Sequence, residues 1–296
     1  MKNQLIRNSL ACLVFAVGLV CAWQLQVRID AERRAIATDK DELMLRSGSL
    51  IKKLSLEYAP LVGAIYWTRA VQYYGEKHRL HDNNLELLWP LLDIATTADP
   101  KLIPAYHVGS MFLSDSPPRG AGDPDTAAKL LQRGMEHNPD YWRFYQDLGY
   151  VYYFDKKDYL KASQAFETGS RYPGTPPWMK IMAAKIAAEG ESLETSYALW
   201  GEIYNTTKDK DIRKNAEEHL RIVRAKLDLR ELDRIADEYE KTHKVRPTRV
   251  TDLIQAGLLS GVPKDPNGFP YVVNEEGKVD LNPKSPLVEA RRKANL

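Results

Sequence analysis

The first strongly apolar segment of the sequence covers residues 9–27 and contains no formally charged side chain. As a helix it would rise roughly 28 Å, which is close to the hydrocarbon thickness of a bilayer. The pattern predicts a transmembrane helix at residues 9–27 after an N-terminal tail at residues 1–8. Lys2 and Arg7 precede the segment, and residues 20–22 form a tolerable cleavage sequence, so a removed signal peptide is the alternative.

Basic residues after this segment bear on its orientation. Arg28, Arg33, Arg34 and Lys40 follow it, and basic residues favour the cytoplasmic side of a membrane. A short tail with two basic residues before a single span behaves instead like an uncleaved signal, which exports the chain that follows. We therefore expect a single-pass protein of the inner (cytoplasmic) membrane, with its soluble part periplasmic or extracytoplasmic.

A second pattern recurs between residues 55 and 209. It consists of a small or apolar residue, a larger apolar residue four positions later and a third small or apolar residue three positions after that. The first positions of the four copies are separated by 39, 35 and 34 residues, and they are Leu88, Ala127, Ala162 and Ser196. A proline follows each of the first three copies, where it would end a helix by removing a backbone donor. This period predicts a series of helical hairpins.

A partner helix precedes each copy and carries an apolar residue followed directly by a small one. The best example is Leu148-Gly149, with Val108-Gly109 and Ala183-Ala184 in register. These positions resemble the tetratricopeptide repeat (TPR) family. The resemblance implies an all-α solenoid of about four hairpins over residues 55–209, in which small residues let neighbouring helices approach closely. The first copy departs from the pattern, because Arg69-Ala70 stands where the apolar and small pair belongs.

The segments around the repeats complete the predicted organisation. Residues 28–54 are expected to form a membrane-proximal helical segment. The charged, amphipathic residues 210–245 are expected to form a capping helix or helices, since a terminal repeat needs a polar outer face. Proline and glycine punctuation predicts a small α+β module with a β-hairpin at residues 246–282, and residues 283–296 are expected to be a polar tail.

Residues 263–271 of this module read PKDPNGFPY. The segment resembles the D-P-x-G-x-P-Y stretch near the C-terminus of major pseudopilins of type II secretion. In that family the stretch belongs to a calcium-stabilised β region, which implies a metal near Asp265 and Asn267. The residues by themselves favour a tight Pro-Asn-Gly turn followed by a β-hairpin. We therefore predict a structural turn and no metal.

Net charge and cysteine content narrow the function further. The 296-residue chain carries a net charge of +2, of which residues 1–34 contribute +3, so the rest carries −1. A nucleic-acid-binding surface needs clustered Lys and Arg, and that class is set aside. Cys12 and Cys21 would face opposite sides of a helix that turns about 100° per residue. They cannot pair, and no disulfide framework or thiolate metal site follows.

Common catalytic patterns are missing from the sequence. It contains no P-loop, dinucleotide-binding, nucleophile-elbow or H-E-x-x-H signature. His78 and His81 lie in a polar inserted loop, where histidines are more often solvated than bound to a metal. We therefore predict that the protein is not an enzyme and has no cofactor. The alternative is an enzyme subunit with a metal or catalytic site at the inserted loops around His78 and Asp123.

The stronger functional signal comes from the first helix of each hairpin, whose inward face lines the concave groove in TPR arrays. Projected onto that register, aromatic residues gather along the groove together with arginine, glutamine and lysine. Aromatic and arginine side chains of this kind supply most of the binding energy at protein interfaces. The predicted partner-binding residues are Trp67, Tyr74, Tyr106, Arg143, Gln146, Tyr150, Tyr153, Trp178 and Lys185.

These observations together predict a membrane-anchored TPR scaffold at the bacterial cell envelope that binds a peptide or helix of a protein partner. The pseudopilin-like segment suggests a secretion or pilus-like assembly, and no nucleic-acid partner is expected. Some of the aromatic residues would instead pack between neighbouring repeats. A self-assembling structural protein, whose repeats stack between chains, is a further alternative.

Overall fold

A computed structural model gives the structure of residues 17–20, 22–28 and 47–293. The chain divides into two compact units, Met1–Ser47 and Gly48–Leu296. In the first unit, residues 17–20 and 22–28 are helical and exposed. The predicted N-terminal tail, both cysteines and most of the predicted membrane-proximal segment lie outside the described residues.

The predicted membrane location is contradicted. Among the described residues, no helix is both long enough and apolar enough to cross a bilayer. Residues 9–16 and 21 of the predicted span lie outside the described residues. We therefore correct the prediction of a single-pass inner-membrane protein with an exported soluble part.

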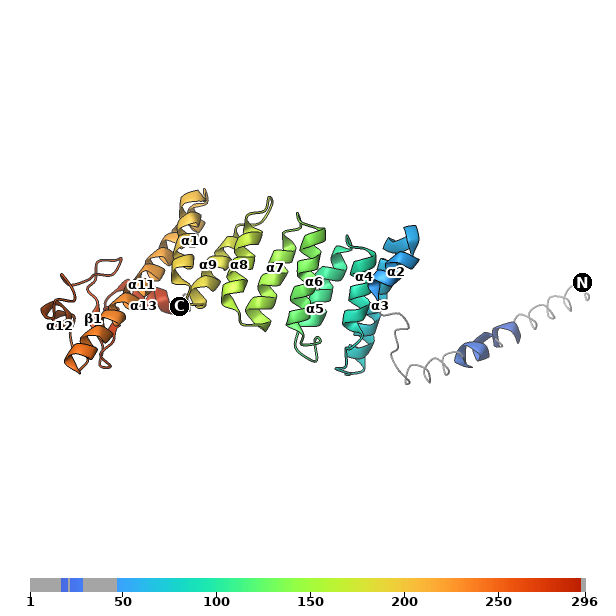
Figure 1. Ribbon diagram of the computed structural model, residues 1–296, viewed down its shortest axis with the longest axis horizontal. Coiled ribbons are helices and arrows are strands. Elements are labelled where there is room, and N and C mark those ends of the chain that lie inside the picture. The colour runs from blue at the N-terminus through green and yellow to red at the C-terminus, as the bar shows by residue number, and fades with distance from the viewer. Residues whose placement is uncertain (1–16, 21, 29–46, 294–296) are drawn as a thin grey trace, which may run out of the picture. The chain divides into compact units, whose positions relative to one another are not determined.

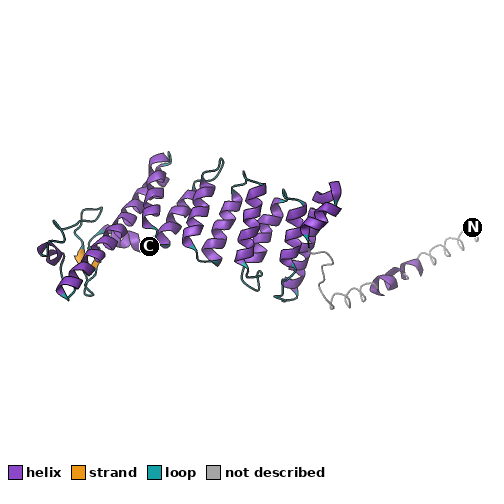
Figure 2. Cartoon of the chain, in the orientation of Figure 1, coloured by secondary structure: helices purple, strands orange, loops and turns teal. Residues whose placement is uncertain are grey.

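The second unit is mostly helical, which confirms the helical fold class (Figure 2). Up to residue 206, its helices form consecutive hairpins in which each helix packs against the next (Figure 1). The first helices of the hairpins are α3 (Ala59–Arg79), α5 (Ile103–Ser114), α7 (Arg143–Tyr150) and α9 (Trp178–Glu189). The second helices are α4 (Leu88–Ala98), α6 (Pro124–His137), α8 (Tyr159–Ser170) and α10 (Leu193–Thr206). A short helix α2 (Gly48–Leu54) and a 3-10 turn η1 (Leu56–Tyr58) precede them, and α2 packs on α3 and α4.

The recurring sequence positions form the core of these hairpins. In each second helix, the first position and the apolar residue four positions later are both fully buried. These side chains are Leu88, Leu92, Ala127, Leu131, Ala162, Phe166, Ser196 and Trp200. The pattern in the sequence is therefore a packing pattern, since it marks the face that each second helix turns toward its neighbours.

Glycine in the first helices permits the close approach of the second helices. A Cβ atom on Gly149 would lie 2.6 Å from Cε2 of Phe166, and a Cβ atom on Gly109 would lie 2.8 Å from Cδ2 of Leu92. Separations below 3 Å are repulsive, so any larger residue would push α7 away from α8 or α5 away from α4. The apolar and small pairs of the sequence thus have a direct steric reason.

A single long helix, α11 (Lys210–His243), follows the hairpins and packs against α10. Asp209 begins it by accepting hydrogen bonds from the backbone N–H groups of Asp211 and Ile212. Lys244 ends it in the left-handed conformation, with a φ of 61°. The range predicted for one or more capping helices thus contains one helix.

The C-terminal residues pack against α11. They comprise α12 (Val250–Gln255), the antiparallel strands β1 (Val272–Val273) and β2 (Val279–Asp280), and α13 (Pro286–Lys293). Tyr271, Val279, Leu281 and Leu287 form a small core with Ile222 and Leu232 of α11. The range predicted as a polar tail therefore contains a helix, because Leu287 is buried in this core.

Candidate functional site

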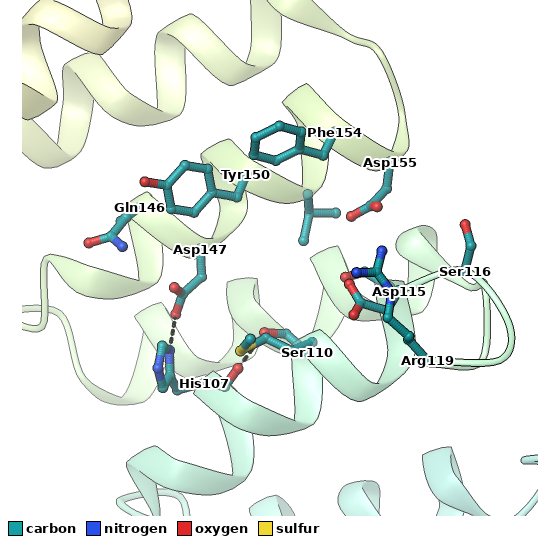
Figure 3. A pocket seen from close by; sticks show the side chains of 13 residues that line it. His107, Ser110, Asp115, Ser116, Arg119, Gln146, Asp147, Tyr150, Phe154 and Asp155 are labelled. Atoms are coloured by element: carbon teal, nitrogen blue, oxygen red, sulfur yellow. Dashed lines mark hydrogen bonds and ion pairs between the residues drawn. The ribbon is translucent and has the colours of Figure 1, made fainter. Parts of the chain in front are cut away.

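A cavity of about 640 Å³ lies between the first helices of the second and third hairpins (Figure 3). One wall is α5 with the loop that follows it, and the other wall is α7 with its continuation, η2 (Val151–Asp155). The lining combines apolar and aromatic side chains with several charged ones, and it consists of His107, Ser110, Met111, Ser114, Asp115, Ser116, Arg119, Gln146, Asp147, Tyr150, Val151, Phe154 and Asp155. We call this cavity the α5–α7 groove.

The α7 wall of the groove contains a π-helical turn. The backbone N–H of Lys156 donates to the carbonyl oxygen of Val151, five residues earlier, at 3.1 Å. Tyr150 directly precedes this turn and Phe154 lies within it, and their rings stack with centroids 5.8 Å apart. Phe154 is 56% exposed although it is a large apolar side chain. Single π-helical turns occur often at functional sites, and this one presents two aromatic rings to the groove.

A hydrogen bond between two side chains crosses the groove. Nδ1 of His107 on α5 lies 2.6 Å from Oδ2 of Asp147 on α7 (Figure 3). The Asp147 side chain is only 8% exposed, and burial raises the pKa of its carboxyl group above the ordinary value, although the hydrogen bond with His107 opposes that shift. No described residue donates a hydrogen bond to the other oxygen, Oδ1 of Asp147. One acceptor on a buried carboxylate is therefore available to a ligand.

Two further carboxylates line the end of the groove near the inserted loop. Burial raises the pKa of Asp155, and repulsion from Asp115 adds to that shift. A hydrogen bond with Ser114 and the charges of Lys157 and Arg119 act in the opposite direction. Within the described residues, neither Asp115 nor Asp155 has an ion-pair partner within 4.0 Å.

The inserted loop between α5 and α6 is fixed by contacts on both sides. Its backbone N–H groups at Ala121 and Gly122 donate to the carbonyl oxygens of Phe112 and Asp115, each at 2.9 Å. On its other side, the hydroxyl of Tyr74 donates to the carbonyl oxygen of Arg119 at 2.6 Å. These bonds hold Asp115 and Arg119 at the groove.

The predicted residues Trp67 and Tyr74 lie on α3 and contact Phe112 of the next hairpin. The rings of Tyr74 and Phe112 stack with centroids 3.8 Å apart, and those of Trp67 and Phe112 are 6.4 Å apart. Partial burial raises the pKa of the Tyr74 hydroxyl. Both side chains therefore pack between hairpins and do not line the α5–α7 groove.

Tyr106 requires a correction. It was predicted to bind a partner, but its side chain is fully buried. Its hydroxyl donates to the carbonyl oxygen of Thr96 at 3.3 Å, and its ring meets the edge of Phe144 at 5.6 Å. Desolvation accordingly raises the pKa of Tyr106 to about 12. Successive residues of a helix are rotated by about 100°, so Tyr106 and His107 point in different directions. Tyr106 points into the core, and His107 lines the groove.

Two predicted residues, Gln146 and Tyr150, do line the groove. Arg143 is exposed one turn earlier on α7, with its guanidinium 5.1 Å from the ring centre of Trp142. Its positive charge opposes the rise in the pKa of Asp147 that burial causes. The structure thus brings Gln146 and Tyr150 together in the groove and places Arg143 outside the lining.

The remaining predicted residues lie toward the fourth hairpin. The hydroxyl of Tyr153 donates to Glu189 at 2.9 Å, and partial burial with this contact raises the pKa of Tyr153 to about 12. Trp178 is 37% exposed and packs edge-on against Phe166. Lys185 is exposed on α9. None of the three lines the α5–α7 groove.

The candidate metal-binding residues have other roles in the structure. Nδ1 of His78 lies 3.4 Å from the carbonyl oxygen of Pro118, and Asp123 begins α6 by accepting from the N–H of Thr126. Asp265 accepts hydrogen bonds from the N–H groups of Asn267 and Phe269 at 2.9 Å. In the part of the chain that the structure describes, no three His, Cys, Asp or Glu side chains are grouped as metal ligands would be.

His107, Asp115, Asp147 and Asp155 are among the groove residues that were not singled out from the sequence. A signal for two of them exists. His107 and Asp147 both stand two residues before the buried glycine of their hairpin, at Gly109 and Gly149. Equivalent positions on adjacent repeats lie side by side, so this spacing predicts the observed pair. The positions of Asp115 and Asp155 in the groove depend on the inserted loop and on the π-helical turn. No comparable sequence pattern predicts them.

Comparison with known proteins adds no relative. No family model matches the sequence, and neither a curated protein nor a solved structure matches it.

Proposed function

We propose that this protein is a TPR-like scaffold that binds a peptide segment of a partner protein in the α5–α7 groove. The observation that carries the proposal is the groove itself, a cavity of about 640 Å³ between two first helices with exposed aromatic rings on one wall. Ligand-binding cavities commonly have volumes of about 300 to 1,000 Å³ and mix apolar walls with a few polar groups. The protein acts by binding and does not catalyse a reaction.

The side chains that line the groove can contact a few consecutive residues of a bound peptide. Met111 and Phe154 are 52% and 56% exposed, so both present apolar surface that a partner would cover. Polar groups of Gln146 and Asp147 stand beside them and would orient a peptide backbone or side chain. An apolar centre with flanking polar groups is the usual composition of a protein interface.

The repeat architecture supports the same function. The chain resembles TPR proteins in its small residues and in the spacing of its second helices, and its hairpins pack consecutively as that resemblance implies. In such arrays the first helices of the hairpins face the ligand. The α5–α7 groove is formed by first helices, and we therefore assign the binding face to them. The secretion or pilus-like assembly stays a prediction.

A peptide-display selection tests the proposal. The full-length chain is used to select from an unbiased library of seven-residue peptides, and the selected peptides are synthesised and titrated by fluorescence anisotropy. We expect Phe154→Ala to weaken binding at least tenfold. The matched control is Leu160→Ala, which removes a 50% exposed apolar side chain on α8 outside the groove, and it should change the Kd less than twofold.

The proposal fails if no peptide is selected, or if Phe154→Ala and Leu160→Ala have the same effect. A thermal unfolding curve for each variant shows that the folded state is retained. Because both side chains are at least half exposed, we expect little change in Tm for either.

Exposed apolar residues at the start of the second unit favour a second candidate, self-assembly. Leu54, Leu56, Tyr58 and Leu61 are 66%, 80%, 71% and 59% exposed. Adjacent exposed apolar side chains of this kind mark association surfaces. Sedimentation across a hundredfold concentration range tests this candidate. A molecular mass that rises with concentration in the unaltered chain, and that stays at the monomer mass in Leu56→Glu, supports self-assembly. A constant monomer mass excludes it.

A further inference from the structure

The lining of the α5–α7 groove carries more negative than positive side chains, and this imbalance indicates the kind of peptide that it binds. Its lining contains three carboxylates, Asp115, Asp147 and Asp155, and one guanidinium, Arg119. The imidazole of His107 is hydrogen-bonded to Asp147. Lys157 and Arg143 act on these carboxylates from outside the lining. The groove therefore offers more acceptors than donors.

Some carboxylate oxygens of the groove accept no hydrogen bond from a described residue. Asp147 is nine-tenths buried, yet no described residue donates to its Oδ1 atom. Asp115 and Asp155 line the same end of the cavity (Figure 3), and the negative charge of Asp115 contributes to the raised pKa of Asp155. A cation placed between them would offset that negative charge and would supply the missing donors.

Aromatic rings stand next to these carboxylates. Tyr150 and Phe154 stack on each other along the wall that ends at Asp155 (Figure 3). Cations bind favourably over the faces of aromatic rings, and arginine does so more often than lysine because its guanidinium is planar. A guanidinium also has five N–H donors, which is enough to serve two carboxylates at once.

We infer that the α5–α7 groove recognises a peptide through an arginine side chain, held between the Tyr150 and Phe154 rings and the carboxylates of Asp115 and Asp155. The volume of about 640 Å³ exceeds one side chain, so a neighbouring apolar residue of the peptide packs on Met111 and Val151. This inference rests on the proposed peptide-binding function and specifies its ligand.

The test uses the peptides selected on the full-length chain. Each arginine in a selected peptide is replaced in turn by citrulline, which keeps the shape of the side chain and removes its charge. We expect one replacement to raise the Kd at least tenfold, and the Kd of the parent peptide to rise with salt concentration.

Protein variants give the reciprocal measurement. Asp155→Asn and Asp115→Asn keep the size of each side chain and should each weaken the parent peptide about fivefold or more. The citrulline peptide, which lacks the charge, should bind Asp155→Asn and the unaltered chain equally. Asp140→Asn is the matched control, because Asp140 is exposed in the loop before α7 and outside the groove, and it should have no effect.

The outcomes separate this inference from the proposed function. If Phe154→Ala weakens a peptide but citrulline replacement and Asp155→Asn change its Kd less than twofold, the groove binds peptides and the arginine inference is wrong. If Phe154→Ala has no effect on any selected peptide, the proposed groove function itself is wrong.

Discussion

Two aspartates, one in the C-terminal module and one in the groove, are similarly buried but differ in their hydrogen-bond partners. Asp265 is 4% exposed and Asp147 is 8% exposed. Asp265 accepts from the backbone N–H groups of Asn267 and Phe269 and from the hydroxyl of Ser285. Asp147 accepts from His107 alone among the described residues. Burial by itself therefore does not separate a structural carboxylate from a candidate site, and only Asp147 combines burial with a place in the lining of a cavity.

The local sequence explains the difference. Asp265 stands at the start of a Pro-Asn-Gly turn, where the chain folds back and delivers its own N–H groups to the carboxylate. Asp147 lies inside a helix, where the backbone N–H groups are already bonded within the helix. Its partners must come from another element, and α5 supplies only one.

The largest expected effect is that of Asp265→Ala. The substitution leaves two N–H groups and the Ser285 hydroxyl without their acceptor in a buried site, and we expect a loss of about 3 kcal/mol in the stability of the C-terminal module. Hydrogen exchange of the amides of Asn267 and Phe269 measures it. Asp265→Asn, which keeps one acceptor, should lose less, and equal exchange in all three proteins would refute the structural role.

A third buried group, His219, makes no hydrogen bond through its Nδ1 atom among the described residues. Its Nδ1 atom is unbonded and its ring stacks on Trp200 at 4.3 Å, while burial and then the charge of Lys185 lower its pKa to about 4. The folded state therefore resists protonation of this histidine. Stability from this group should fall by roughly 3 kcal/mol as the pH decreases from about 6.5 to about 4.

Urea unfolding at several pH values checks the prediction for His219. His219→Phe keeps a flat ring against Trp200 and cannot titrate, so its free energy of unfolding should fall less over the same pH interval. An identical pH dependence in both proteins would show that other groups control acid unfolding.

Gly149→Ala tests whether the groove wall depends on the packing behind it. The added Cβ atom would lie 2.6 Å from the buried ring of Phe166, and we expect a loss of about 2 kcal/mol. Gly201→Ala on α10 is the control, since no atom lies within 4 Å of its Cβ position, and it should gain roughly 0.5 to 1 kcal/mol. Thermal unfolding measures both, and equal shifts would contradict the packing role of Gly149.

Asp147→Asn should have the smallest effect on stability, a change of about 1 kcal/mol or less at neutral pH. Burial raises the pKa of Asp147, so the folded state holds this proton to a higher pH than the unfolded state. Stability from this group therefore decreases as the pH rises above the ordinary aspartate pKa. The variant should lack that decrease when urea unfolding is compared at rising pH above about 4. A loss of stability as large as that of Asp265→Ala would remove the contrast between the two sites.

The hairpins were predictable because their signal is local and repeated. Apolar residues equivalent to Phe166 recur once in each hairpin, at spacings of 34 to 39 residues, and they are buried in every second helix. The groove residues were predictable only in part. Gln146 and Tyr150, predicted to bind a partner, line the groove, whereas Tyr106, predicted with them, is buried beside His107, which lines the groove.

The sequence by itself determined the helical hairpins, their packing positions and the turn at Asp265, because each follows from contacts between residues close in the chain or repeated along it. Tertiary structure alone decided which side chains meet in the α5–α7 groove. A shift of one residue rotates a helical side chain by about 100°, and the π-helical turn at Val151–Asp155 changes the register again. The position of Asp115 depends on a loop held by Tyr74 from a different hairpin, a contact between residues far apart in the chain.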